Sequence, residues 1–209
     1  MSFGVKEFGE IQKYESVFES SPAFFVCSSG NNSLVNYPAC SRFCLGVGGS
    51  NIDFYADSTQ ETAYDKSGCG VSRYIKIPDC QLDSTVGVRL LSAYRRAVPD
   101  ITFFAGSKNG VATIFHGKET SCFGTSIGAP CIAGFCACIA QNDKSILTKK
   151  ASFFYELAEK CGYNTEKCAF FDITNGGSGK HSAHKGFDLC TGLGSPNMGA
   201  ILKDCHILS

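Results

Sequence analysis

The sequence predicts a single α/β domain, residues 1–209, built on a parallel sheet with helices on both faces. Two short apolar runs at 23–27 and 43–47 are followed directly by Ser or Gly, which is typical of strands buried on both faces. A longer run of apolar and small residues at 126–140 exceeds the usual strand length and indicates a buried helix. Buried strands and helices together favour a parallel sheet covered on both sides.

The elements of the first half follow from local patterns. Residues 51–81 are polar around a Gly-rich centre and predict a long surface loop or hairpin. Residues 86–96 predict a helix, which a proline ends before a strand at 101–104. At the start of the chain, apolar residues at every third position predict a surface helix over 5–20: Val5, Phe8, Ile11, Tyr14 and Val17.

In the second half, Asn109-Gly110 lies between two apolar runs and predicts a hairpin turn. An amphipathic helix is expected over 151–161. The segment from Phe171 onward is rich in Gly, Ser and Asn, so we expect a structured loop there.

Composition excludes several classes of protein. With 44% hydrophobic and 18% charged residues the chain can bury a full core. Nineteen basic residues balance nineteen acidic ones, so neither nucleic acid nor an anionic membrane is an expected partner. No apolar run approaches the roughly 18 residues of a spanning helix, and the charged N-terminal residues do not fit a signal peptide. As written, the sequence predicts an intracellular protein.

The cysteine content points the other way. Thirteen cysteines in a chain of this size are typical of a disulfide framework, and the odd number leaves at least one thiol free or paired with another chain. No Cys-x-x-Cys pair suited to zinc occurs. Cys131, Cys136 and Cys138 lie in an apolar stretch and are expected to be small core residues. The other cysteines are candidates for cross-links between chains.

The principal chemical motif is Gly124-Thr125-Ser126 at the start of the predicted helix 126–140. Free N–H groups and the helix dipole favour negative charge beside a nucleophilic serine at such a position. Taken alone, the motif is more often a simple helix cap than a nucleophile site.

Motifs in a fixed order give the chain a family resemblance. It resembles the C-terminal half of the catalytic domain of sedolisins, serine peptidases with the subtilisin fold. The resemblance implies a three-layer subtilisin-like parallel sheet, truncated at its N-terminal side. It is carried by Gly124–Pro130 together with Ser2-Phe3-Gly4, Ser28–Asn32, Tyr37-Pro38-Ala39, Gly46–Ser50, Gly68–Ser72, Arg96–Ile101, 171–174 and 186–197.

The resemblance also implies site residues. Ser126 takes the nucleophile position, and Asn31 takes the oxyanion position, where the family has Asp. Asn can donate a hydrogen bond to an oxyanion, although it is also a common turn residue. The substrate cleft is expected beside Gly68, Gly70 and Ser72.

A Ca²⁺ site is the implied cofactor site. Calcium takes six or more oxygen ligands, and a Gly-rich loop can turn backbone carbonyls inward between two carboxylates. The alternative is a polar loop held by ordinary hydrogen bonds. The implied ligands are the side chains of Asp172 and Asp188 and the carbonyls of Ile173, His184 and Gly186.

A catalytic serine needs a base. In sedolisins the base and its partner, a Glu and an Asp, lie upstream of the Ser2-Phe3-Gly4 element, and this sequence has no counterpart of them. His116 and Glu119 on the predicted hairpin are local substitutes, although surface charges of this kind are usually only solvated. The truncated sheet should also expose an edge, so we expect a homo-oligomer or an assembly partner.

Three hypotheses follow. The first is a non-catalytic structural or self-assembling protein, cross-linked by disulfides. The second is an active serine peptidase whose acid and base residues come from another chain. The third is a calcium-stabilised module that still binds peptides in the cleft.

Overall fold

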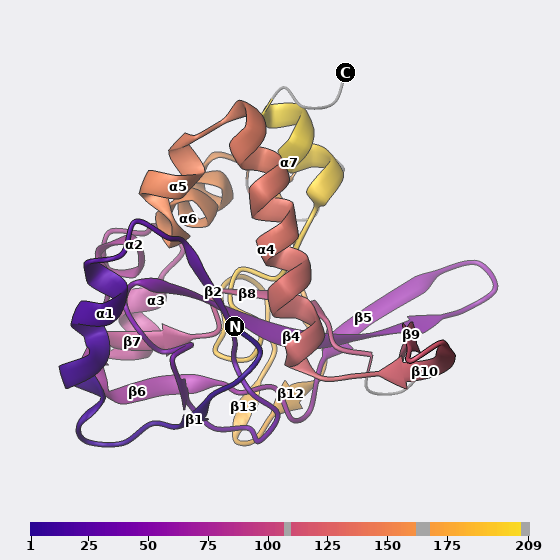
Figure 1. The fold of residues 1–209 in the computed structure, drawn as a ribbon, viewed down its shortest axis with the longest axis horizontal. Coiled ribbons are helices and arrows are strands. Elements are labelled where there is room, and N and C mark those ends of the chain that lie inside the picture. Colours follow the sequence, from indigo (N-terminus) through magenta and orange to yellow (C-terminus); the bar gives the residue numbers. More distant parts are fainter. Residues whose placement is uncertain (107–109, 162–167, 206–209) are drawn as a thin grey trace.

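The computed structural model describes residues 1–106, 110–161 and 168–205. Its central sheet joins β2 (Phe25–Ser28), β4 (Cys44–Phe54) and β8 (Ile101–Phe104) in parallel, in the order β2, β4, β8. The far half of β4 also pairs antiparallel with β5 (Thr59–Ala63), and this hairpin extends away from the body of the molecule (Figure 1). The predicted α/β class and the strands at 23–27, 43–47 and 101–104 are confirmed.

Side chains alternate between two cores on opposite faces of the sheet. Val26 and Leu45 belong to one core, while Cys27 and Cys44, their neighbours in sequence, belong to the other. Successive residues of a strand point to opposite faces, so a continuous apolar run fills both cores. The sheet is therefore a middle layer, as the sequence predicted.

The first face is covered by α4 (Thr125–Asn142), which packs against β2, β4 and β8. Next to it α5 (Ser145–Lys149), α6 (Ala151–Cys161) and α7 (Met198–Asp204) gather at one end of the molecule (Figure 1). The bounds of α6 match the predicted helix 151–161.

The second face is covered near the N-terminus. The 3₁₀ helix η1 (Ile11–Tyr14), α1 (Glu15–Glu19) and β3 (Asn36–Tyr37), which pairs with β1 (Val5–Lys6), supply side chains to its core. The antiparallel strands β6 (Gly70–Lys76) and β7 (Arg95–Val98) add to this core, while α2 (Asp79–Leu82) packs on α6. Other short elements are α3 (Val88–Ser92), β9 (Val111–Phe115), β10 (Lys118–Cys122), β11 (Phe170–Phe171), β12 (Gly177–Ser178), β13 (His181–Ser182) and β14 (Ser195–Pro196).

Several expected elements were wrong. The single helix over 5–20 is instead a short strand, a 3₁₀ turn and one helical turn, and Ile11 alone of its proposed apolar stripe is buried. Within 51–81, the part from Ala63 onward is largely buried and contains β6, so it is not a surface loop. The helix over 86–96 is reduced to α3, since its last residues join β7.

Two further expectations changed. The helix at 126–140 exists, but it is buried on one side only. Asn109 lies outside the described residues, and the hairpin seen in this region joins β9 and β10 across His116-Gly117. Within 1–106, 110–161 and 168–205, no helix is long and apolar enough to cross a membrane.

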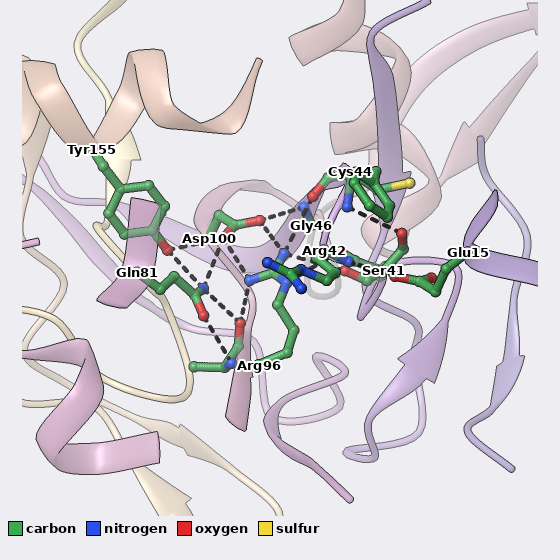
Figure 2. A network of polar contacts seen from close by, with 12 residues as sticks. Glu15, Ser41, Arg42, Cys44, Gly46, Gln81, Arg96, Asp100 and Tyr155 are labelled. Atoms are coloured by element: carbon green, nitrogen blue, oxygen red, sulfur yellow. Dashed lines mark hydrogen bonds and ion pairs between the residues drawn. The ribbon is translucent and has the colours of Figure 1, made fainter. Parts of the chain in front are cut away.

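A buried ion pair connects the central sheet to three neighbouring elements (Figure 2). The guanidinium of Arg96 binds the carboxylate of Asp100 through two N–H groups, at 2.7 and 2.5 Å, and both side chains are almost wholly buried. Asp100 also accepts hydrogen bonds from the Gly46 backbone N–H, the Gln81 amide and the Tyr155 hydroxyl. The pair therefore links β4, β7, α2 and α6.

Candidate functional site

Ser126 lies in the first turn of α4, at the C-terminal end of the parallel strands. Gly124 precedes the helix with φ of 101°, a conformation that side chains other than Gly rarely adopt. Ser126 Oγ donates a hydrogen bond to the carbonyl of Ser2 at 3.3 Å, and the Ser2 hydroxyl donates back to the Ser126 carbonyl at 2.9 Å. The serine therefore has the helix start predicted for it.

Asn31 lies directly beside this helix start. Its Oδ1 accepts hydrogen bonds from the Thr125 backbone N–H at 2.9 Å and from the Thr125 hydroxyl at 3.1 Å. This leaves its Nδ2 as a donor, for which no acceptor occurs among the residues described. The N–H of Ser126 belongs to the first helical turn, where N–H groups have no acceptor within the helix. Two donors suited to an oxyanion thus flank Ser126.

Among the residues that the structure describes, Ser126 Oγ is hydrogen-bonded to a backbone carbonyl and to no general base. Within the described part of the chain, no carboxylate or imidazole forms a hydrogen bond with its Oγ. His116 and Glu119 lie on the β9–β10 hairpin and are exposed. The described residues therefore bring together Ser126 and the donors beside it, while the predicted roles of nucleophile and oxyanion donor stay predictions.

A large open cavity, about 1020 Å³, lies next to the turn that carries Asn31. Asn32 and Gly70 line it, and Gly70 has φ of 123°, with the ring of His181 close to its Cα. Gly70 is therefore the one predicted cleft glycine that contributes to the cavity wall among the residues described.

The other two predicted cleft residues have structural roles. A Cβ on Gly68 would lie 1.8 Å from the carbonyl oxygen of Ser29, so only Gly fits there. Ser72 is 1% exposed, and its hydroxyl donates to Glu7 Oε2 at 2.6 Å. Neither residue lines the cavity.

The predicted calcium loop is organised around Asp188, whose side chain is fully buried. Its oxygens accept hydrogen bonds from the backbone N–H groups of His184, Cys190 and Thr191, and from the Thr191 hydroxyl. Asp172 Oδ2 accepts one from the Gly186 N–H at 2.9 Å. Burial and, to a smaller degree, the charge of Asp188 raise the pKa of Asp172.

These residues fit a calcium ion by the chemistry of their donors. Ca²⁺ prefers oxygen ligands, and the loop offers two negatively charged carboxylates that repel each other when no cation lies between them. Among the residues described, the carbonyls of Ile173, His184 and Gly186 accept no hydrogen bond. The hydrogen bonds to Asp188 show equally that the loop has internal support of its own.

The cysteines correct one expectation. Cys136 is buried, but Cys131 and Cys138 are exposed on α4, because these two positions lie on the side of the helix away from the sheet. Cys122 on β10 is a third exposed thiol. The predicted cross-links remain a prediction.

Sequence reasoning missed the charged lining of the cavity. Lys6, Arg73 and Lys180 come from three separate segments and meet only in the fold. No spacing in the sequence could have grouped them. It also missed the ion pair of Arg96 and Asp100, although their separation of four residues within a matched motif was a usable signal.

Residues 1–157 match the model of the Subtilase family. Xanthomonalisin of Xanthomonas sp. (strain T-22) is 27% identical over 87% of this chain and 24% of its own length. Tripeptidyl-peptidase 1 of Dictyostelium discoideum is 30% identical over 94% of this chain and 35% of its own length. The chain thus spans about a quarter to a third of these curated relatives.

Among solved structures, Pseudomonas sedolisin, a serine-carboxyl proteinase complexed with two molecules of pseudo-iodotyrostatin, superposes with a TM-score of 0.78. It is 24% identical in sequence, and the match covers 94% of this chain and 61% of that one. At this identity the match shows the fold.

Proposed function

This chain belongs to the subtilase family and is sedolisin-like, and on that premise we propose that it is a non-catalytic domain that binds peptide segments in the cavity lined by Asn32 and Gly70. One observation carries the proposal. Ser126 Oγ donates to a backbone carbonyl, that of Ser2, and no described carboxylate or imidazole is bonded to it. Without a base, a serine hydroxyl is a weak nucleophile.

The cleft supports the binding part of the proposal. Its volume, about 1020 Å³, lies at the upper end of the range of ligand sites. Apolar side chains such as Leu34, Val71 and Leu189 line it beside charged ones. Such a mixed wall suits a peptide, which presents both apolar side chains and polar groups.

The test uses a fluorophosphonate probe at pH values from about 3 to 7, with intact mass as the readout. The proposal expects no adduct on the wild-type protein and none on a Ser126→Ala variant. An adduct that forms on the wild type and disappears in Ser126→Ala would contradict it. An active sedolisin-type peptidase, treated in parallel, shows that the probe works under these conditions.

A second candidate function is peptide hydrolysis with a base supplied by another polypeptide. The observation that favours it is the pair of donors at Ser126, the Asn31 Nδ2 group and the Ser126 N–H, which have no acceptor among the described residues. If a second copy supplies the base, the rate of probe labelling per molecule should rise with protein concentration. A rate independent of concentration would count against a second copy as the source.

We also propose that the protein self-associates and that cysteines stabilise the assembly. The exposed thiols Cys122, Cys131 and Cys138 are accessible to another chain. Light scattering after gel filtration, with and without reductant, tests this. A monomer under both conditions would exclude cross-linked assembly.

For calcium, we propose that the loop between Asp172 and Asp188 binds one ion that stabilises the fold. The oxygen ligands of the loop and the mutual repulsion of the Asp172 and Asp188 carboxylates support this proposal.

A further inference from the structure

The cavity beside Asn31 carries an excess of positive charge. Three of its lining side chains are cationic, those of Lys6, Arg73 and Lys180, and all three are exposed. None of them forms an ion pair with any residue that the structure describes. They come from β1, from β6 and from the turn between β12 and β13, so the fold brings them to one opening.

The acidic residue that lines this cavity, Glu7, is already held by other groups. Its Oε2 accepts a hydrogen bond from the buried Ser72 hydroxyl at 2.6 Å, and its Oε1 accepts one from the Arg73 backbone N–H at 3.0 Å. The carboxylate is therefore stabilised by hydrogen-bond donors rather than by a neighbouring cation. The charge of Glu7 offsets one of the three positive charges, so the lining keeps a net charge of about +2.

The remaining wall is largely apolar. Phe8, Val71, Tyr74, Leu91 and Leu189 line the cavity between the cationic positions. A charged group near apolar walls is less screened than one in open water, so a carboxylate that enters between the three cations is favoured over a neutral group of the same shape.

We propose that this cavity selects peptides with an acidic side chain, whose carboxylate lies between Lys6, Arg73 and Lys180 while neighbouring residues of the peptide pack on the apolar wall. The proposal rests on the peptide-binding function proposed above and names its ligand class. Asn32, the residue after Asn31, lines the cavity, so the proposed peptide site begins next to the turn that caps α4.

The experiment compares three fluorescein-labelled octapeptides, identical except for a central Glu, Gln or Lys, by fluorescence anisotropy at pH 7 and low salt. At this pH His181, which also lines the cavity, is neutral, because burial and the neighbouring Lys180 lower its pKa. The Glu peptide should bind about tenfold more tightly than the Gln peptide, and the Lys peptide most weakly. The difference should shrink in high salt.

Charge reversal identifies the surface. The double variant Arg73→Glu with Lys180→Glu should reverse the order, so that the Lys peptide binds best. The single variant Lys180→Glu should remove the preference for the Glu peptide, and Lys203→Glu is its matched control with the same change in net charge, because Lys203 is an exposed lysine on α7 and does not line the cavity. Lys180→Gln is a milder variant. Its affinity for the Glu peptide should fall about threefold, while its affinity for the Gln peptide should stay the same.

Each outcome separates the two proposals. Equal affinity for the Glu and Gln peptides would leave peptide binding in place and overturn the acidic preference. The same loss of preference in Lys203→Glu would assign it to the overall charge of the protein and overturn the site. If none of the three peptides binds, the proposed peptide-binding function fails, and the acidic preference fails with it.

Discussion

Asn31 Oδ1 accepts hydrogen bonds from both the backbone N–H and the hydroxyl of Thr125, at 2.9 and 3.1 Å, and so caps α4 from a distant part of the chain. The residue before the helix, Gly124, has no side chain that could do this. The Thr125 hydroxyl in turn accepts from the Gly30 N–H at 3.1 Å. The turn after β2 is thus fixed to the helix that carries Ser126.

This contact predicts the effect of replacing Asn31. Asn31→Ala removes the acceptor from a helix N-terminus and should lower the free energy of unfolding by about 1–2 kcal/mol, measured by urea denaturation. Asn31→Asp is the matched control, since it keeps the acceptor and adds a charge that the helix N-terminus favours. Equal losses for both variants would show that the hydrogen bonds do not stabilise α4.

Gly124 predicts a second effect at the same helix start. A Cβ at this position would lie 2.7 Å from Asn31 Nδ2, and φ is 101°. Gly124→Ala should therefore lower the free energy of unfolding by about 1–3 kcal/mol. Gly134→Ala, within the same helix, has nothing within 4 Å of the new Cβ and should raise it by up to about 1 kcal/mol. Thermal unfolding of the two variants should shift in opposite directions.

The buried pair of Arg96 and Asp100 gives the third prediction. Arg96→Ala leaves the carboxylate of Asp100 buried without its cation, so the free energy of unfolding should fall by about 3–5 kcal/mol. The exposed pair of Arg42 and Asp79, at 3.6 Å, is the comparison. Arg42→Ala should cost no more than about 1 kcal/mol. Similar losses in the two variants would contradict the difference expected from burial.

Sequence reasoning succeeded where a short segment fills its own environment. The runs at 25–28 and 101–104 are strands because every residue in them is apolar or small enough to be buried on either face. The helix 151–161 alternates apolar and polar residues with a helical period. In these segments local pattern and tertiary contacts demand the same structure.

Local patterns gave wrong predictions where contacts between distant segments of the chain determine the structure. The first 20 residues have a helical period, yet backbone pairing of Val5 with Tyr37 draws the start of the segment into a strand. The polar segment around Gly70 is buried because β6 pairs with β7, more than twenty positions later in the chain. The cationic cavity could not be foreseen for the same reason, since its side chains converge from three segments.

The cysteines of α4 supply the fourth prediction. Cys131 and Cys138 are exposed, whereas Cys136 is buried and burial raises the pKa of its thiol to about 12. Only the thiolate reacts with an alkylating reagent, so in the reduced, native protein iodoacetamide should modify Cys131 and Cys138 and leave Cys136 unmodified. Peptide mass mapping distinguishes the sites. Rapid modification of Cys136 in the native state would show that α4 is packed differently.

The proposed calcium loop predicts how the stability of the protein changes with pH. The pKa of Asp172 in the folded protein is raised, first by burial and also by the charge of Asp188. The folded state therefore binds the proton more tightly than the unfolded chain does. Stability from this group is present at low pH and is lost as the pH rises through the unfolded and then the folded pKa.

A bound Ca²⁺ ion reverses this loss, because it neutralises the ionised carboxylate. Without calcium, the melting temperature should fall as the pH rises and Asp172 ionises, and added Ca²⁺ should restore it increasingly at higher pH. At a concentration one hundred times its dissociation constant, the ion would add about 2.7 kcal/mol. Asp172→Asn should remove both the pH slope and the calcium response, while Asp204→Asn, an exposed position on α7, should keep them. A melting temperature that neither calcium nor a chelator changes would mean that hydrogen bonds to Asp188 alone hold the loop.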